Sequence, residues 1–286
     1  MAFRIVADSS ANVLSLPGVN YATVPMKIVA AKEYVDDPSL DVAAMVADLQ
    51  HHKGKSGSSC PNVGEWLDAF ADGEEIFCIT ITKHLSGSYN SALQAASQYM
   101  EEHPNRKVYV LDSLTAGPEL MMLVDKILEC EANGMDFETT AATVSDYSNH
   151  NHTLFCLESM INLARNGRTS MAVAKIAGLL GIRVLGDAEG GQIVPVHKPR
   201  GLKKALSGLV EMIQERGFKD GNLVRIAHCF AEEAASNLQN LILEKFPHAR
   251  FILDRTSALC SFYAEAGGLI IGFEGSFNVK NDNAVY

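Results

Sequence analysis

The sequence predicts an α/β protein of two domains, an N-terminal domain with a parallel sheet between helices and a C-terminal domain with a mixed or antiparallel sheet. Short apolar runs alternate with helical patterns along the chain, which favours α/β over all-α or all-β folds. The pattern changes near residue 150, where a polar stretch at 148–155 leads into a new apolar run. The length of 286 residues suits two domains, which we place at 1–150 and 151–286.

The stretch 75–96 is the most informative part of the N-terminal domain. A β-branched apolar run is followed by a Ser-Gly-Ser turn and a helix-forming segment, which predicts a buried strand, a tight turn and a helix N-terminus. The hydroxyls of Thr82, Ser86 and Ser88 then lie where unpaired backbone N–H groups point outward. Such a turn attracts an anion without a cationic side chain, so we expect an anionic group here.

Two other predicted strands end in the same kind of side chain. The strand at 3–7 precedes Asp8–Ser10, and the strand at 107–111 precedes Asp112–Ser113 and a helix at 118–130. Ligands of an open parallel sheet bind beyond the carboxyl ends of its strands, so the three turns are expected to meet at one edge. Taken singly, each turn is more often only a helix cap or an Asx turn.

The remaining elements follow from shorter patterns. A Gly-Gly turn at 190–191 predicts an antiparallel hairpin. The other predicted elements are a strand at 21–29, a loop rich in Gly, Ser and Lys at 53–61, a helix at 172–181, strands at 182–186 and 193–197, a helix from Leu202, and strands at 225–230 and 250–254 with a long helix between them.

Charge and cysteine usage limit the partners and the compartment. The formal net charge of −10 argues against nucleic acid and against adsorption to an anionic membrane. The six cysteines form no CxxC pair and several lie in apolar runs, which is typical of buried free thiols in a reducing compartment. The N-terminus shows no signal-peptide pattern, and no apolar run approaches the roughly 18 residues of a membrane span. We therefore expect a cytoplasmic protein without membrane insertion.

Common catalytic and cofactor motifs are missing from the sequence. No GxGxxG follows a strand, and no GxSxG occurs. The GKS at 54–56 lacks the upstream glycine of a P-loop, because Leu49 stands in its place. The nine histidines include no grouping with zinc spacing. We predict no catalytic residue, no metal and no cofactor; a small-molecule phosphoryl-transfer enzyme that uses Asp8 and Asp112 is the enzymatic alternative.

Several segments occur in an order that is typical of one protein family. They read RIVADSSANV, VPMKIVAAKEYVDD, SSCPNVGEW, HLSGSYNSALQAA, VLDSLTAG, NGRTSMAVAKIAGLLGIRVL and VHKPRGLKKAL. In these segments, and along nearly its whole length, the chain resembles the DegV family. The resemblance implies a protein that binds a long-chain fatty acid between its two domains and presents it to a separate fatty acid kinase, which phosphorylates the carboxylate.

The resemblance also implies which residues hold the carboxylate. In the family, hydroxyls of a Thr-Ser-Gln-Pro loop and of a Ser-Gly-Thr turn do so. By position, the head-group residues of this chain are Ser58, Ser59, Ser86, Gly87, Ser88 and Tyr263.

The C-terminal segment departs from the family pattern. The family reads His-x-Gly-x-Gly, whereas this chain has Tyr263 in place of the His and Glu265 in place of the first Gly. Tyrosine still donates a hydrogen bond, but a glutamate disfavours a second carboxylate nearby. A carrier of a different amphiphile is therefore a further alternative.

The hydrocarbon tail of a fatty acid needs an apolar slot. Candidate walls are Met121 and Met122 on the helix at 118–130 and Ile161 ahead of the Gly-Arg pair. Ordinary core packing explains the same residues. Arg168 either neutralises a charge or closes its loop by hydrogen bonds to carbonyl groups.

A basic cluster stands out on an otherwise acidic chain. It consists of Lys198, Arg200, Lys203 and Lys204. The resemblance places Arg200 in a region that meets the kinase, and we expect Arg200, Lys203 and Lys204 to dock this partner. A solvated helix face is the alternative.

Overall fold

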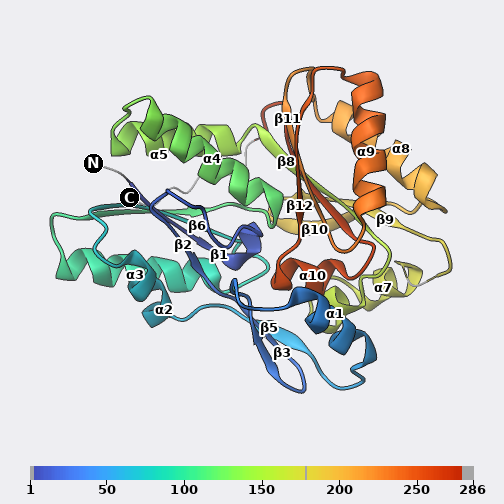
Figure 1. Cartoon of the computed structure of the whole chain (residues 1–286), viewed down its shortest axis with the longest axis horizontal. Helices are drawn as coiled ribbons and strands as arrows, with labels where there is room; N and C mark the ends of the chain where they lie inside the picture. The colour runs from blue at the N-terminus through green and yellow to red at the C-terminus, as the bar shows by residue number, and fades with distance from the viewer. Residues whose placement is uncertain (1–2, 178, 279–286) are drawn as a thin grey trace.

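The computed structural model describes residues 3–177 and 179–278 and contains three sheets. A four-stranded sheet has the order β2-β1-β6-β7, a six-stranded sheet has the order β10-β9-β8-β13-β11-β12, and a small sheet has the order β4-β3-β5. The first two belong to different halves of the chain, which lie side by side (Figure 1). The predicted class, a parallel-sheet domain followed by a mixed-sheet domain, is confirmed.

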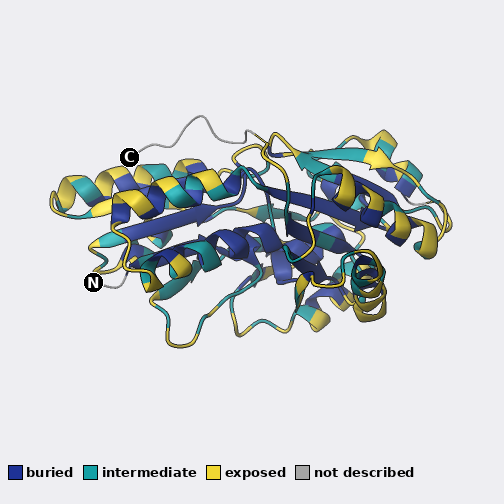
Figure 2. Ribbon diagram, turned by 90° about the horizontal axis from the view of Figure 1, so that it is seen from above, coloured by how far each residue is buried: buried dark blue, intermediate teal, exposed yellow. Residues whose placement is uncertain are grey.

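The N-terminal domain is a parallel sheet between two layers of helices. Its strands are β1 (Arg4–Asp8), β2 (Tyr21–Val24), β6 (Glu75–Thr80) and β7 (Lys107–Asp112), and all neighbours are parallel. Figure 1 shows α4 (Pro118–Ala132) and α5 (Phe137–Ser148) on one side and α2 (Val63–Phe70) and α3 (Ser88–Glu102) on the other. Covering both faces makes the strands almost wholly buried, as Figure 2 shows.

The C-terminal domain is built on the six-stranded mixed sheet. Its strands are β8 (Asn151–Leu157), β9 (Val184–Glu189), β10 (Gln192–His197), β11 (Leu223–His228), β12 (Arg250–Arg255) and β13 (Leu269–Glu274). The β11–β12 pair is parallel and the other neighbours are antiparallel. The predicted hairpin is confirmed as the antiparallel β9–β10 pair.

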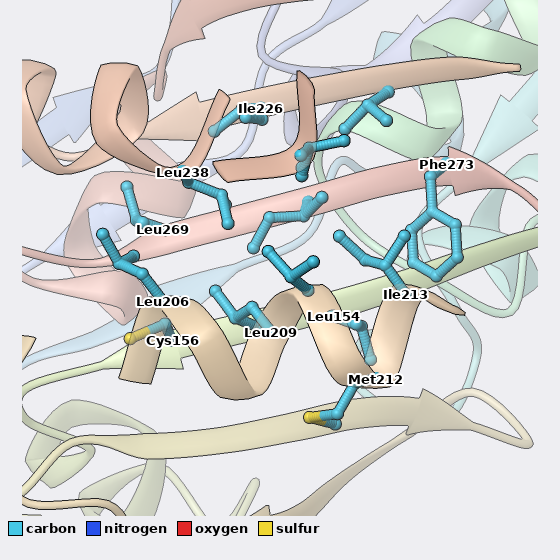
Figure 3. Packing of buried hydrophobic residues seen from close by; sticks show 14 of the residues in the cluster. Leu154, Cys156, Leu206, Leu209, Met212, Ile213, Ile226, Leu238, Leu269 and Phe273 are labelled. Atoms are coloured by element: carbon cyan, nitrogen blue, oxygen red, sulfur yellow. The ribbon is translucent and has the colours of Figure 1, made fainter. Parts of the chain in front are cut away.

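Helices cover both faces of this sheet. On one face lie α8 (Leu202–Glu215) and α9 (Glu232–Lys245). Leu206, Leu209 and Ile213 recur at helical spacing on α8 and point into the core against β8 and β11 (Figure 3). The other face carries α6 (Ile161–Arg165), α7 (Met171–Ala177) and α10 (Ala258–Ala264) and is turned toward the N-terminal domain. The helix predicted at 172–181 is thus shorter, and residue 178 lies outside the described residues.

The strand predicted at 21–29 is two strands in two sheets. Pro25 lacks an N–H group and interrupts the run between β2 and β3 (Lys27–Val29). The next amide, that of Met26, donates to Ser9 Oγ at 3.0 Å. The chain then enters the small sheet with β4 (Glu33–Val35) and β5 (Gly57–Ser59), flanked by α1 (Val42–His51). The stretch 53–61, which we expected to be a loop, therefore contains a strand.

The structure describes the state of the cysteines and the lengths of the helices, which the sequence analysis used to judge compartment and membrane insertion. All six cysteines are free; five are buried and Cys60 is half-buried. Within the described ranges, no helix has the length and apolar character needed to cross a bilayer.

Candidate ligand-binding site

The three hydroxyl-rich turns meet at one edge of the parallel sheet. Asp8 joins the first turn to the turn after β6, and the amide of Lys83 in that turn donates to Asp112 of the third. The fully buried carboxylate of Asp8 accepts hydrogen bonds from the amide of Ile81 at 2.9 Å, from Ser88 Oγ at 2.7 Å and from Ser10 Oγ. Burial raises the pKa of Asp8, and these hydrogen bonds oppose that rise. The expectation that the Ser88 hydroxyl holds a ligand head group is not supported, because this hydroxyl is committed to Asp8.

A cavity lies between this sheet edge and the inner face of the C-terminal sheet. Its volume is about 110 Å³, against the roughly 10–15 Å³ that one water molecule needs. The apolar residues that line it come from both domains: Met26, Ile81, Leu85, Ala116, Phe155, Leu157, Leu163, Ala188, Ile193, Leu259, Ala264 and Ile270. An apolar cavity of this kind suits a hydrocarbon ligand.

Ser58 and Arg168 line the cavity and lie against Tyr263, which also lines it. Ser86 lines the same cavity next to Leu85, whose carbonyl accepts from Arg168. The phenol oxygen of Tyr263 lies 2.7 Å from Ser58 Oγ, and the guanidinium of Arg168 lies 5.7 Å from the centre of its ring. The Ser86 Oγ accepts from the amide of Ser88 at 3.2 Å. We call Ser58, Ser86, Arg168 and Tyr263 the hydroxyl–arginine cluster. It offers three hydroxyl groups and one cation to a ligand.

Arg168 closes its loop through carbonyl groups. Its Nε donates to the carbonyl of Leu85 at 3.2 Å and its Nη1 to the carbonyl of Asn166 at 2.7 Å. The preceding Gly167 has a φ of +73°, a conformation that glycine adopts without strain. These bonds tie the Gly-Arg loop to the Ser-Gly turn and leave the guanidinium charge at the cavity.

Tyr263 is positioned by the anchoring of α10. Asp36, which follows β4, accepts from the amides of Ala258 and Leu259 at 2.8 and 3.0 Å, so that it caps the start of this helix. Burial raises the pKa of Asp36. On the same helix, Phe262 packs against the small sheet and α1. The helix with Tyr263 is thereby fixed to the segment that carries Ser58.

Glu265 does not line the cavity. Its carboxylate accepts from Ser159 Oγ at 2.9 Å and from the amide of Asn162 at 3.2 Å at the start of α6. Burial raises the pKa of Glu265. The expected conflict with a ligand carboxylate therefore has no geometric basis. The residue has φ 55° and ψ 169°, a backbone region that glycine favours, as the family pattern implies.

The β9–β10 hairpin closes one side of the cavity. A Cβ atom on Gly191 would lie 2.4 Å from Thr82 Oγ1 and 3.0 Å from the His84 ring. Only a glycine allows so close an approach, and its φ of +77° also favours glycine. Gln192 and Ile193, next along the hairpin, line the cavity.

Several residues expected at the ligand lie elsewhere. Ser59 follows Ser58 on β5, so its side chain points to the opposite face of the strand, and the residue is exposed. Gly87 is exposed at the start of α3. Met121 is buried between α4 and the parallel sheet, and Met122 near Gly272 of β13. Ile161 packs beside α7 in the core. None of these five is among the described residues that line the cavity.

Other lining residues were missed by the sequence reasoning. Thr153, Phe155 and Leu157 alternate along β8, a period of two that places them on one face. Thr115 lies just after the Asp-Ser turn of β7. The alternation was a usable signal, but which face meets the other domain depends on contacts between distant segments. Groups of three or more His, Cys, Asp or Glu that are placed to hold a metal do not occur among the described residues.

Fold and site together define a two-domain α/β protein with an apolar cavity between its domains. The chain belongs to the DegV family: residues 2–274 match the family model described as "Uncharacterised protein, DegV family". A DegV domain-containing protein of Streptococcus gordonii is 37% identical over 280 residues, which covers 96% of this chain and 99% of the relative.

Two solved structures of relatives contain a fatty acid. A DegV family protein from Eubacterium eligens, loaded with heptadecanoic acid, has a TM-score of 0.93 and 37% identity. The fatty acid kinase (Fak) B3 protein of Streptococcus pneumoniae, loaded with linoleic acid, has a TM-score of 0.93 and 38% identity. Each comparison covers 96% of this chain and 100% of the other. The fold predicted from the sequence is therefore that of proteins that bind fatty acids.

Proposed function

We propose that this protein binds a long-chain fatty acid in the cavity, with its carboxylate at the hydroxyl–arginine cluster. The observation that carries the proposal is the position of this cluster, where Ser58, Tyr263 and Arg168 come together beside an apolar cavity. Hydroxyl groups donate to a carboxylate, and the guanidinium supplies the opposite charge. The fatty acids bound by the two relatives support the same ligand class.

The two parts of such a ligand contribute unequally to affinity. A tail of about fourteen methylenes gains roughly 11 kcal/mol on burial, at about 0.8 kcal/mol each. One hydrogen bond to a charged head group adds only about 1.5–3 kcal/mol net. The cavity thus holds the ligand, and the hydroxyl–arginine cluster determines which end of it lies at the Ser-Gly turn.

The second part of the proposal is presentation of the carboxylate to a partner kinase. Lys198, Arg200, Lys203 and Lys204 are exposed, and none of them forms an ion pair with another described residue. Free cations on an acidic protein favour an acidic partner surface and raise the association rate. One relative is itself the B3 protein of a fatty acid kinase, which supports a partner of this kind.

The proposal extends to domain limits and location. We place the domain boundary near residue 150, because β8 of the mixed sheet begins at Asn151. Six free thiols support a reducing, cytoplasmic compartment.

The phosphoryl-transfer alternative has less support. Asp8 is fully buried and both of its carboxylate oxygens accept hydrogen bonds from the protein. Asp112 accepts from the amides of Lys83 and Leu114 and pairs with the Lys83 ammonium at 3.5 Å. Both carboxylates organise turns. A carrier of a different amphiphile would use the same cavity, and the experiment below separates the two.

The test is mass spectrometry of lipid extracted from the purified protein, followed by titration of the delipidated protein. We expect a long-chain fatty acid in stoichiometric amount. Ser86→Ala should weaken binding of palmitic acid about tenfold and leave binding of hexadecanol nearly unchanged, because only the acid has a charged head group. Ser97→Ala, on the exposed face of α3, is the matched control. Absence of both extracted and added fatty acid would refute the proposal.

A further inference from the structure

A second polar group lies in the cavity, away from the hydroxyl–arginine cluster. Thr115 and Thr153 both line the cavity and are 1% and 5% exposed. Thr115 Oγ1 lies 2.7 Å from Thr153 Oγ1, which in turn lies 2.6 Å from Glu119 Oε2. Glu119 is fully buried in the first turn of α4. The three side chains form a buried chain of hydrogen bonds that ends at an acidic group.

Which group donates in each of these hydrogen bonds determines what kind of ligand group can bind here. Each threonine hydroxyl has one proton and two acceptor lone pairs. Thr153 gives its proton to the Glu119 carboxylate, so the proton between the two threonines must come from Thr115. Thr115 Oγ1 therefore retains acceptor capacity, and no described residue donates to it. A group that donates a hydrogen bond can be satisfied at this point.

The hydrogen-bonded residues Thr115 and Thr153 lie where the hydrocarbon tail of the ligand would run, and not at its carboxylate. Leu157, at the end of β8, packs with Leu163. The carbonyl of Leu163 accepts from the amide of Arg168 at 2.8 Å. This end of β8 therefore lies near the hydroxyl–arginine cluster. Thr153 lies four residues away along β8, which is about 13 Å at the usual rise of a strand. If the carboxylate of a fatty acid is held at the hydroxyl–arginine cluster, its hydrocarbon tail therefore passes Thr115 and Thr153.

A plain hydrocarbon would leave this acceptor unsatisfied in an apolar setting, which is unfavourable. We propose that the cavity takes long-chain fatty acids that carry a hydroxyl group on the chain, and that this hydroxyl donates a hydrogen bond to Thr115 Oγ1. Thr115 gives its one proton to Thr153 and has none left to donate, so the group recognised is a hydroxyl, which can donate, and not a second carboxylate, which only accepts. The inference deepens the proposed function and rests on it.

The test compares delipidated wild-type protein with Thr115→Val by titration with stearic acid and with a positional series of monohydroxystearic acids. Valine keeps the shape of threonine and removes the acceptor. For at least one hydroxy isomer, the ratio of the Kd of stearic acid to the Kd of the hydroxy acid should fall about tenfold in Thr115→Val.

Thr143→Val, on α5 and away from the cavity, is the matched control and should keep the wild-type ratio. Stearic acid reports in every variant whether the cavity is intact. If each hydroxy isomer gives the same ratio in the wild type and in Thr115→Val, the inference is wrong while the proposed function stands. If stearic acid does not bind to the wild-type protein, the proposed function itself fails.

Discussion

The hydroxyl oxygens of Ser58 and Tyr263 lie 2.7 Å apart although 205 positions separate the two residues. Ser58 comes from the middle of β5 in the small sheet, and Tyr263 from α10 of the C-terminal domain. Asp36 joins the two elements by capping α10. The hydroxyl pair therefore forms only when both domains are in place.

Removal of the Tyr263 hydroxyl tests its role at the ligand. In Tyr263→Phe the ring still packs against Phe262 and under Arg168, but one donor to the carboxylate is lost. A hydrogen bond to a charged group contributes about 1.5–3 kcal/mol, so we expect the Kd for palmitic acid to rise about tenfold or more. Tyr21→Phe, whose hydroxyl donates to the carbonyl of Val13, is the control. Equal affinities in both variants would remove Tyr263 from the site.

Much of the fold was predictable because local patterns decide it. Strands β1, β6 and β7 each end in Asp or hydroxyl residues, and parallel topology brings these ends together. Pro25 was the visible signal that 21–29 is not one strand.

The site was less predictable because its residues are selected by contacts between distant segments. The sequence does not indicate that the Ser88 hydroxyl turns to Asp8, eighty positions away, while Ser86 faces the cavity. In the same way, Met121 on α4 packs in the core, whereas Thr153 on β8 faces the cavity. Whether a residue is apolar or polar does not alone show whether it packs in the core or lines the cavity.

Gly191 allows the hairpin to close over the Thr82–His84 turn. In Gly191→Ala the new methyl would meet Thr82 Oγ1 at 2.4 Å, so the hairpin must shift away from the cavity. We expect faster release of fatty acid in stopped-flow displacement, and a loss of about 1–3 kcal/mol in the free energy of unfolding from overpacking.

The neighbouring glycine supplies a control for this prediction. Gly190 also has a positive φ, of +56°, but a Cβ there would meet nothing within 4 Å. Gly190→Ala therefore adds backbone strain without the contact and should leave the release rate close to that of the wild type. Similar release rates in the two variants would show that the hairpin contact does not retain the ligand.

Glu265 combines an unfavourable backbone conformation with useful hydrogen bonds. Glu265→Ala removes the bonds to Ser159 and Asn162 and keeps the strained φ of 55°, whereas Glu265→Gly removes both the bonds and the strain. Strain of this kind costs about 1–3 kcal/mol, so the glycine variant should be the more stable by about 1–2 kcal/mol. Urea denaturation measures the difference. A glycine variant no more stable than the alanine variant would mean that the backbone at this position is not strained.

Asp8 should make the stability of the protein depend on pH. Burial raises its pKa above the ordinary value of 3.8, so the native state keeps this proton longer than the unfolded chain. Raising the pH from about 4 through the folded pKa therefore lowers the free energy of unfolding. In Asp8→Asn this contribution is absent, so the stability difference, wild type minus variant, should decrease as pH rises from about 4 to 7. Asp136 has a pKa that is lowered by its hydrogen bond with the Thr139 side chain, so the difference for Asp136→Asn should instead increase with pH, and mainly at pH values near and below 3.8. Urea titrations at several pH values give both differences, and a difference for Asp8→Asn that increases with pH would mean that the buried carboxyl is stabilised as the anion.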